Sequence, residues 1–348
     1  MIRNALLPLS LRLNEYRQRN VALTLPETPR VFFFLAADYG NLGDIAITFA
    51  QRTFLADTLP EHALVTIPIS KTLSSLAAVR ASACSSDIIA LVGGGNTGEI
   101  YSDIEWLRRR IISRFSDLPI IAFPQSVDLA TRRDQKSKAH FFRPYLKHPQ
   151  LSLSLREQRS FDLVNEIWPD PSRLIFAPDI VLSQNFVSKD FQRRGVVLSM
   201  RSDRERDRGR EVDDAITSAI SSRFQVITRR DTELGCRFES WESAEDALHA
   251  HLDAYRKAEL VITDRLHGMI LAERTGTPVL CFDNSNRKIS ATYVDWLADN
   301  PQVGMLDEKS DIGAAIDCIL AAPSPATTLD ADHPAFASLS RAIVKAAA

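Results

Sequence analysis

Three polar side chains that can do chemistry follow one apolar run of the sequence. The run Leu260–Thr263 leads into Asp264, Arg265 and His267. Arginine presents a planar fork of N–H groups that suits a carboxylate or a phosphate, and histidine can donate a proton near neutral pH. A single histidine on an apolar face is more often a packed core residue, but the nearby arginine and the adjacent Gly268 favour a site. We therefore interpret Arg265 and His267 as residues that bind an anion and supply a proton.

Two glycine-rich segments also follow apolar runs. The first is Asp38–Asp44, which holds Gly40 and Gly43, and the second is Val92–Glu99, which holds three consecutive glycines. Glycine lets the backbone approach a ligand closely, and a following helix offers unpaired N–H groups and the positive end of its dipole. The plain alternatives are a tight turn with Asp44 capping the helix, and a crowded chain crossing. As candidate ligand-binding residues these segments contribute Asn41, Gly43, Gly94, Gly95 and Asn96.

Four more polar residues stand at or just after the ends of apolar runs: Arg156, Asp179, Arg201 and Lys288. Ligands of α/β proteins bind outside the carboxyl ends of the strands. We therefore predict these four as further binding residues. None is specific alone, and the mixed-charge run from Arg201 to Arg210 also fits a solvated loop.

These side chains can form one site only if the fold places the carboxyl ends of its strands at the same edge of a sheet. Short apolar runs without polar alternation are typical of parallel strands covered on both faces. Helical stretches such as Ile45–Leu55 and Ile104–Phe115 lie between them, so the sequence predicts an α/β fold with doubly wound sheets. The candidate strands are Val31–Ala36, Leu64–Ile69, Ile88–Val92, Ile120–Phe123, Leu151–Leu155, Leu174–Ala177, Val196–Met200, Phe224–Thr228, Leu260–Thr263 and Val279–Phe282.

The strands form two series separated by the polar stretch Ser183–Arg194, and 348 residues exceed what one core usually carries. We predict two Rossmann-like domains, residues 1–190 and 191–348. The second includes a Pro-rich tail after Ala321 and a final helix around Phe336–Ala346. Candidate helices of this second series are Glu211–Ser221, Ala244–Ala258 and Met269–Arg274.

The amino-acid composition excludes some classes of binding partner. The formal net charge of -2 argues against nucleic acid, since such binding relies on a large excess of basic residues. The four cysteines form no CxxC pair, which fits free thiols in a reducing cytoplasm and predicts neither disulfides nor a zinc site. No dense cluster of potential metal ligands is visible, and no apolar stretch is long enough to span a bilayer.

In these motifs and their order the chain resembles the polysaccharide pyruvyl transferases. The resemblance rests on Gly40–Asp44, Gly93–Gly95, Ser154–Glu157, Pro178-Asp179 and Arg265–Gly268, with weaker support around Lys288, over Val31 to Leu297. It implies a fold like that of the two-domain GT-B glycosyltransferases, with a ligand cleft between the domains. It also implies transfer of a pyruvyl group from phosphoenolpyruvate to two hydroxyls of a sugar, which forms a cyclic ketal.

By that resemblance, Arg265 and His267 bind and activate phosphoenolpyruvate, and no other cofactor is required. Asp44 and Glu99 are candidates for the base. Arg156 and Arg201 are anion ligands by position alone. Bacterial members of the family act on lipid-linked precursors of exopolysaccharide or on cell-wall polymers. The expected location is therefore the cytoplasm, with room for peripheral contact at the inner face of the membrane.

Two alternatives stay open at the level of sequence. A GT-B glycosyltransferase that uses a nucleotide sugar has the same architecture, and its glycine turns would hold a diphosphate. A non-catalytic sugar-binding or regulatory module could also keep the fold. Turnover of a donor separates the module from the enzymes, and binding of phosphoenolpyruvate or of a nucleotide sugar separates the two enzymes from each other.

Overall fold

The computed structural model describes residues 25–129, 131–132, 134–188, 190–201, 209–325 and 329–348. The described chain divides into two compact α/β units. The first unit holds residues up to Asp38, Ile47–Ile180 and His333–Ala348, and the second holds Tyr39–Ala46 and Val181–Asp332. The predicted boundary after residue 190 therefore falls ten residues late. Of the Pro-rich tail, residues 326–328 lie outside the described part, as do residues 202–208 of the mixed-charge run.

The first unit is built on a parallel sheet with strand order β3-β1-β4-β6-β7-β8, and β5 pairs with β6 beside it. Two of its strands are buried along their whole length: all seven residues of β1 are buried, and so are all four of β4. The bounds are β1 Arg30–Ala36, β3 Ala63–Pro68, β4 Ile88–Leu91, β5 Gly94–Gly98, β6 Ile120–Asp128, β7 Leu151–Leu155 and β8 Leu174–Phe176.

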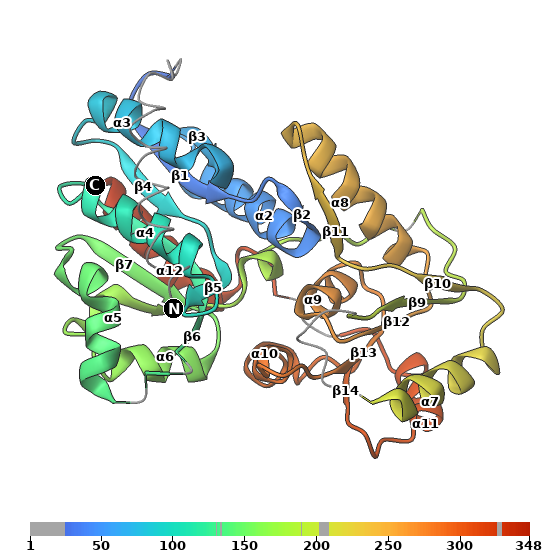
Figure 1. Ribbon diagram of the computed structural model, residues 1–348. Helices are drawn as coiled ribbons and strands as arrows, with labels where there is room; N and C mark the ends of the chain where they lie inside the picture. The colour runs from blue at the N-terminus through green and yellow to red at the C-terminus, as the bar shows by residue number, and fades with distance from the viewer. Residues whose placement is uncertain (1–24, 130, 133, 189, 202–208, 326–328) are drawn as a thin grey trace. The chain divides into compact units, whose positions relative to one another are not determined.

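Helices cover this sheet on both faces (Figure 1). Helix α12 belongs to this unit although it ends the chain: it contacts β6 and β8, and its red ribbon lies among blue and green elements. The prediction placed this helix in the C-terminal domain, which the structure corrects. The bounds are α2 Leu42–Thr58, α3 Thr72–Ser82, α4 Ser102–Arg114, α5 Gln135–Lys147, α6 Gln158–Asn165 and α12 Ala337–Ala347.

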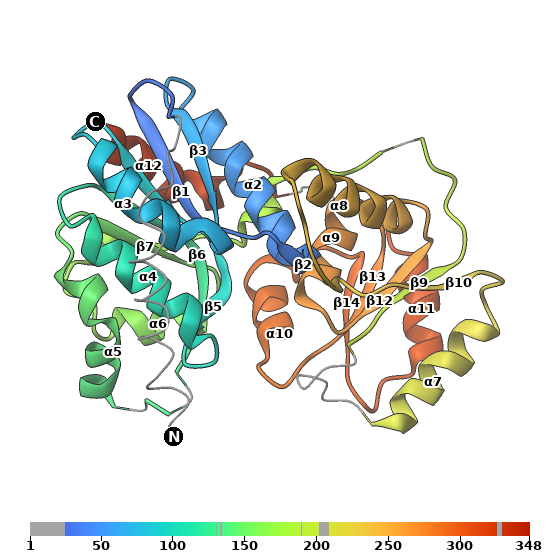
Figure 2. The ribbon, with the colours of Figure 1, turned by 45° about the horizontal axis from the view of Figure 1, so that its top comes forward.

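The second unit is a parallel sheet with strand order β10-β9-β12-β13-β14 (Figure 2). Helices α7 and α11 pack on one face through an apolar core that includes Ile216, Ile316 and Leu198. Helices α8 and α9 contact each other, and α9 packs on β12 and β13. The bounds are β9 Val196–Ser199, α7 Arg210–Ser221, β10 Ile227–Arg229, α8 Trp241–Arg256, β12 Leu260–Thr263, α9 Leu266–Arg274, β13 Val279–Phe282, α10 Lys288–Thr292, β14 Val303–Leu306 and α11 Ile312–Leu320.

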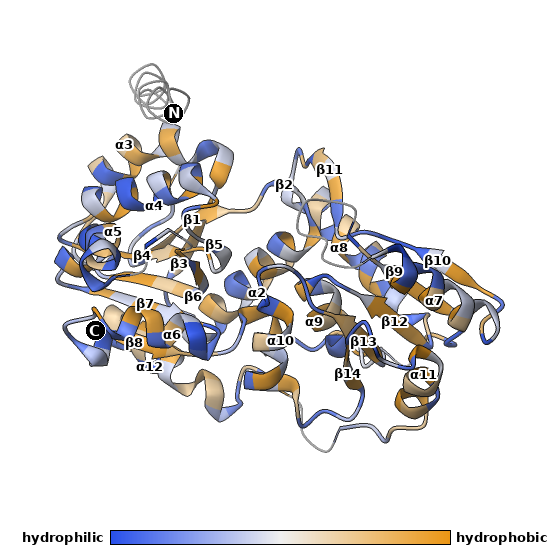
Figure 3. Cartoon of the chain, turned by 60° about the horizontal axis from the view of Figure 1, so that its bottom comes forward, coloured by the Kyte–Doolittle hydropathy of each residue, from blue (hydrophilic) through white to orange (hydrophobic). Residues whose placement is uncertain are grey.

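A small antiparallel ribbon completes the second unit. Strand β2, Tyr39–Asn41, pairs with β11, Glu233–Arg237, so that a segment from early in the chain joins the second unit. Hydrophobic residues are frequent in the strands of the two main sheets (Figure 3). All five residues of β11, by contrast, are exposed. Among the described residues, no helix combines the length and the apolar character needed to cross a bilayer.

In both sheets the order in which successive strands are added reverses at a defined point. In each, the first strand in sequence lies inside, its second strand is added on one side, and all later strands are added on the other. This is the doubly wound order in which ligands bind at the carboxyl ends flanking the reversal. The reversal falls between β1 and β4 in the first unit, and between β9 and β12 in the second. The predicted α/β fold with two Rossmann-like halves is confirmed.

Candidate functional site

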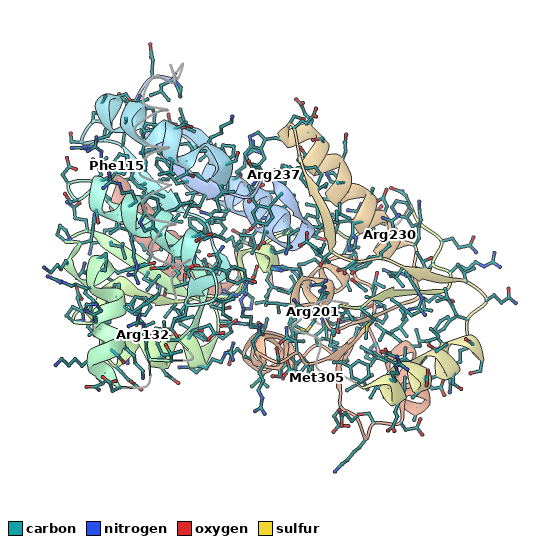
Figure 4. The ribbon with its side chains drawn as sticks, in the orientation of Figure 1. Phe115, Arg132, Arg201, Arg230, Arg237 and Met305 are labelled. Carbon is teal, nitrogen blue, oxygen red and sulfur yellow. The ribbon has the colours of Figure 1, made fainter. Side chains whose placement is uncertain are left out.

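The carboxyl ends of β9 and β12 are joined by hydrogen bonds at the reversal of the second sheet. The backbone N–H of Arg201, labelled in Figure 4, donates to Oδ1 of Asp264 at 2.6 Å. The Thr263 hydroxyl donates to the Ser199 carbonyl at 2.7 Å and accepts from the N–H of Arg265 at 3.0 Å. These contacts fix the turn that carries the predicted Arg265 and His267, so the two motif residues stand where the fold presents its ligands.

Arg265 is the residue immediately before α9 and is only 7% exposed. Its Nη2 donates to Oδ2 of Asp231, at 2.7 Å, and forms an ion pair with it. Asp231 lies two residues beyond β10 and was not among the predicted site residues. A planar guanidinium held by one carboxylate has a defined orientation, which suits recognition of a second anion.

His267 packs against the glycine motif of the early chain. A β-carbon built on Gly43 would lie 2.4 Å from Nδ1 of His267, far inside van der Waals contact. Gly43 and His267 both belong to the second unit, so the structure brings together two motifs more than 200 positions apart in sequence. A β-carbon on Gly268 would lie 2.2 Å from Oγ1 of Thr263, so this glycine is required where the chain turns into α9.

Asn41, rather than Asp44, caps α2. Oδ1 of Asn41 accepts the backbone N–H groups of Gly43 at 3.0 Å and of Asp44 at 3.2 Å, as a cap residue does. Asp44 lies in the first turn of the helix and accepts a hydrogen bond from the Tyr39 hydroxyl at 2.9 Å. The expectation that Asp44 provides the cap is therefore corrected. Its carboxylate stays next to the glycine that His267 touches.

The early segment is attached to the sheet through β11. The N–H of Leu42 donates to the Thr232 carbonyl at 2.7 Å, and Asn41 pairs with Glu233 in the ribbon. Thr232 directly follows Asp231, the partner of Arg265. One turn after β10 therefore holds both the start of α2 and the guanidinium of Arg265.

Lys288 begins α10, after β13, and is 8% exposed. The residue before it, Arg287, adopts a left-handed conformation with φ of 53°. Within the same loop, Asn284 is 3% exposed, and its N–H donates to Oδ1 of Asp283 at 2.9 Å. Lys288 thus follows a strand next to β12 in the same sheet, which agrees with the predicted placement of this cation.

The glycine-rich strand of the first unit is explained largely by close packing on β6. A β-carbon on Gly98, whose φ is 145°, would lie 2.0 Å from the Asp128 carbonyl oxygen, and one on Gly93 would lie 2.9 Å from that of Pro124. This is the crowded crossing that the sequence left open. Asn96 is 9% exposed and accepts a short hydrogen bond from the fully buried Arg108. Gly94 and Gly95 lie in the same strand, which these contacts hold in place.

Glu99 is engaged by the loop after β6. Its carboxylate accepts from the N–H of Thr131 at 2.8 Å and from the Thr131 hydroxyl, and pairs with Nε of Arg132 at 2.9 Å. Burial raises the pKa of Glu99, but the hydrogen bonds from Thr131 and the charge of Arg132 outweigh it, so the pKa is lowered. A carboxylate with a lowered pKa is a weaker base. Glu99 and Asp44 both stay predicted candidates for the base.

Arg156 and Asp179 are partners of each other in the interior of the first unit. Both are 1% exposed and form a short ion pair, and Nε of Arg156 also donates to the Ser126 hydroxyl at 2.7 Å. Glu157 adds a second carboxylate at 3.3 Å. In the structure Arg156 and Asp179 therefore bind each other, and their predicted contact with a ligand stays a prediction. An arginine after a strand looks the same in sequence whether its partner is a ligand or a distant aspartate.

The predicted residues thus fall into two groups. The second unit gathers Asn41, Gly43, Asp44, Arg201, Arg265, His267 and Lys288, and the first unit carries Gly94, Gly95, Asn96, Glu99, Arg156 and Asp179. In the part of the chain that the structure describes, no group of three or more His, Cys, Asp or Glu side chains is arranged to hold a metal ion. The chemistry available in the second unit is that of a guanidinium, an imidazole, a carboxylate and helix N-termini.

This chain is similar in sequence to known proteins. The polysaccharide pyruvyl transferase family model matches residues 41–286. General stress protein 30 of Bacillus subtilis is 34% identical over 279 residues, 78% of this chain and 79% of that protein. Pyruvyl transferase 1 of Schizosaccharomyces pombe is 25% identical over 284 residues, 75% of this chain and 68% of that protein.

A solved structure supports the fold. A Listeria monocytogenes protein assigned as a UDP-N-acetylglucosamine 2-epimerase superimposes with a TM-score of 0.50 at 11% sequence identity, over 88% of this chain and 94% of that one. This likeness concerns the fold alone, which is GT-B-like. The family model covers both the Asn41–Asp44 segment and the Arg265–Gly268 turn that packs against it. The chain therefore belongs to the polysaccharide pyruvyl transferase family.

Proposed function

We propose that this enzyme transfers the pyruvyl group of phosphoenolpyruvate to a sugar of an exopolysaccharide or cell-surface glycan precursor and closes a cyclic ketal. The family match supports pyruvyl transfer to a polysaccharide. The donor, the ketal and a lipid-linked acceptor are part of our proposal. So are the absence of a resident cofactor and a cytoplasmic location, with peripheral contact at the inner face of the membrane.

The presence of both Arg265 and His267 just after β12 is the observation that carries this proposal. Phosphoenolpyruvate has a carboxylate and a phosphate, and its reaction requires a proton. Arg265 supplies a planar donor for an anion, and His267 supplies a group that can hold a proton near neutral pH. The N-terminus of α9, which begins one residue after Arg265, adds favourable dipole charge for a phosphate. Arg201 and Lys288 are further cations of the same unit.

The reaction begins when an acid protonates the methylene carbon of phosphoenolpyruvate, which makes C2 an oxocarbenium-like electrophile. A sugar hydroxyl then attacks C2 and loses its proton to a base. The bond between C2 and the phosphate oxygen breaks, and the phosphate leaves with the electron pair. A second hydroxyl attacks C2 and loses its proton, which closes the ketal. One hydroxyl proton replaces the one used on carbon, and the other leaves on the phosphate.

In this scheme His267 is the acid or a hydrogen-bond donor to the phosphate, and Asp44 is the base. Asp44 directly follows Gly43, on which the His267 ring packs. Its carboxylate accepts a hydrogen bond from the Tyr39 hydroxyl of the same segment. Arg265 stabilises the charge of the donor and of the leaving phosphate.

Heavy water provides the test of this reaction. The methylene of the donor becomes the methyl of the product, so a single protonation in heavy water should place one deuterium in each product methyl. Mass spectrometry of the sugar product after incubation with phosphoenolpyruvate and a panel of lipid-linked precursors measures that label. A nucleotide-sugar glycosyltransferase would transfer a sugar and leave no such methyl, and an enolpyruvyl transfer would leave a vinyl group. Either product would refute the ketal reaction.

The same assay assigns the acid. Loss of a general acid typically lowers the rate by about two to four orders of magnitude, so His267→Ala should reduce ketal formation by that amount. His249→Ala, which removes a half-exposed histidine from α8, is the control and should retain the wild-type rate. Nearly full activity in the His267 variant would show that another group protonates the donor.

A further inference from the structure

Asp231 lies beside the proposed donor site, although no sequence motif marks it. Its Oδ2 pairs with Nη2 of Arg265 at 2.7 Å, and its Oδ1 accepts the N–H of Glu233 at 3.1 Å. Each carboxylate oxygen therefore has a separate task. One holds the guanidinium, and the other fixes the turn that leads into β11. The Asp231 side chain is 28% exposed, against 9% for that of Arg265, so the carboxylate lies on the solvent side of the pair.

The same turn holds the other motif of the unit. The Thr232 carbonyl accepts the N–H of Leu42 at 2.7 Å, at the first residue of α2. Gly43 follows, and the His267 ring occupies the space next to its α-carbon. Asp231 is therefore linked to Arg265 directly, and to the early segment through the carbonyl of the next residue, Thr232. A change in its side chain is transmitted to the arginine first.

The charge of Asp231 has a consequence for any anion that reaches Arg265. A guanidinium that is already paired with a carboxylate attracts a second anion less strongly, because the two negative groups repel each other at short range. The pairing also keeps the planar fork in one orientation, which reduces the entropy lost when a ligand forms hydrogen bonds with it. The repulsion weakens the binding of an anion, whereas the fixed orientation of the guanidinium favours both binding and the rate.

We propose that Asp231 is a positioning residue that orients Arg265 for the donor and weakens the hold of the site on phosphate, so that product phosphate leaves readily. This inference rests on the proposed function, because it assumes that Arg265 contacts the phosphate or carboxylate of phosphoenolpyruvate. Asp231 itself touches neither the donor nor the reacting atoms. It acts through the guanidinium.

Asp231→Asn tests the proposal, since it removes the charge and keeps the shape. We expect the dissociation constant for inorganic phosphate to fall about fivefold, because a repelling charge is lost, and kcat to fall about tenfold, because Arg265 is less well held. The measurements are calorimetric titration with inorganic phosphate and steady-state kinetics with phosphoenolpyruvate. Glu233→Gln is the matched control: it removes the same charge two positions away and should change neither value.

The outcomes separate this inference from the proposed function. Wild-type phosphate affinity and kcat in Asp231→Asn, or the same changes in the Glu233 control, would overturn the role of Asp231 while leaving the function intact. If the wild-type enzyme neither binds nor consumes phosphoenolpyruvate, the function and the inference both fall. Should the Asn variant not fold, Asp231→Glu decides. It keeps the charge and alters the geometry, so it should lower kcat without tightening phosphate binding, and an unchanged kcat would refute the proposal.

Discussion

The ring of His267 occupies the space that a β-carbon on Gly43 would need, and this close approach is open to test. In Gly43→Ala the new methyl group would meet Nδ1, Cγ and Cβ of His267 within 2.8 Å, so the imidazole must move. A displacement of about 1 Å can cost on the order of a hundredfold in rate. We expect kcat for pyruvyl transfer to fall by about that factor while the protein stays folded.

Gly209→Ala is the control for this variant. Among the described residues, its chain neighbours aside, no atom lies within 4 Å of a β-carbon at Gly209, and its φ of -78° is accessible to alanine. This change should leave kcat within about twofold of the wild-type value, although alanine is a poorer cap than glycine and can lower stability by roughly 1 kcal/mol. Wild-type activity in Gly43→Ala would mean that the position of the His267 ring is not critical for catalysis.

Whether a site residue could be predicted from the sequence depends on whether an apolar run marks the strand before it. Arg265 and His267 follow a fully buried strand, so an apolar run marks their position. Asp231 follows β10, whose three residues are exposed or half-buried, and the apolar run predicted there ended at Thr228. Arg156 also follows a buried strand, but its partner Asp179 comes from 23 residues further along. Only the folded chain shows which side chain each arginine pairs with.

At the scale of elements, the sequence predicts most strands of the two main sheets. The runs Val31–Ala36, Ile88–Val92 and Val279–Phe282 match β1, β4 and β13 to within one residue at each end. The missed strands are β2, β5, β11 and β14, and each contains glycine. Strand β5 exists because its glycines allow it to lie against β6, which is a tertiary effect that no local pattern shows.

Helix α8 carries a buried histidine whose protonation should couple stability to pH. His251 is 1% exposed, and its ring centroid lies 4.5 Å from that of Tyr255. Burial lowers the pKa of His251 to about 4, Arg230 acts in the same direction, and Asp231 opposes them. In the unfolded chain the ordinary pKa is about 6.5. The unfolded state therefore binds more protons between these values, and the free energy of unfolding falls as pH drops from about 6.5 to about 4.

The size of this loss is about 3 kcal/mol when the whole pKa difference counts. His251→Phe keeps an aromatic ring beside Tyr255 and removes the titrating group, so urea unfolding between pH 4 and pH 7 should show a smaller acid-side loss by that amount. His249→Phe, on the same helix but half-exposed, should leave the slope as in the wild type. Equal slopes in the wild type and the His251 variant would contradict a depressed pKa at this position.

At the scale of the whole molecule, the path of the chain differs from a simple division into halves. The segment Tyr39–Ala46 belongs to the second unit although it lies between two parts of the first, and α12 returns to the first unit after the second is complete. Sequence predicted two Rossmann-like domains because two series of strands are visible. It could not predict these exchanges, since each depends on contacts between residues more than 150 positions apart.

The return of α12 leads to a prediction about which unit depends on it. The Phe336 side chain is fully buried, its ring lies 5.7 Å from that of Phe54 in α2, and Phe54 in turn lies 6.3 Å from Phe123 in β6. All three residues belong to the first unit. Truncating a buried phenylalanine costs about 3–5 kcal/mol, so Phe336→Ala should destabilise the first unit by that amount.

Hydrogen exchange can distinguish the two units, because it reports the opening of each part of a protein separately. In Phe336→Ala we expect amides of β4 and β6 to lose protection, while those of β12 and β13 keep most of theirs. Val344→Ala removes a side chain from the same helix that is 51% exposed, and it should leave both sets unchanged. Loss of protection confined to β12 and β13 would instead assign the C-terminal helix to the second unit, as the order of the sequence alone had suggested.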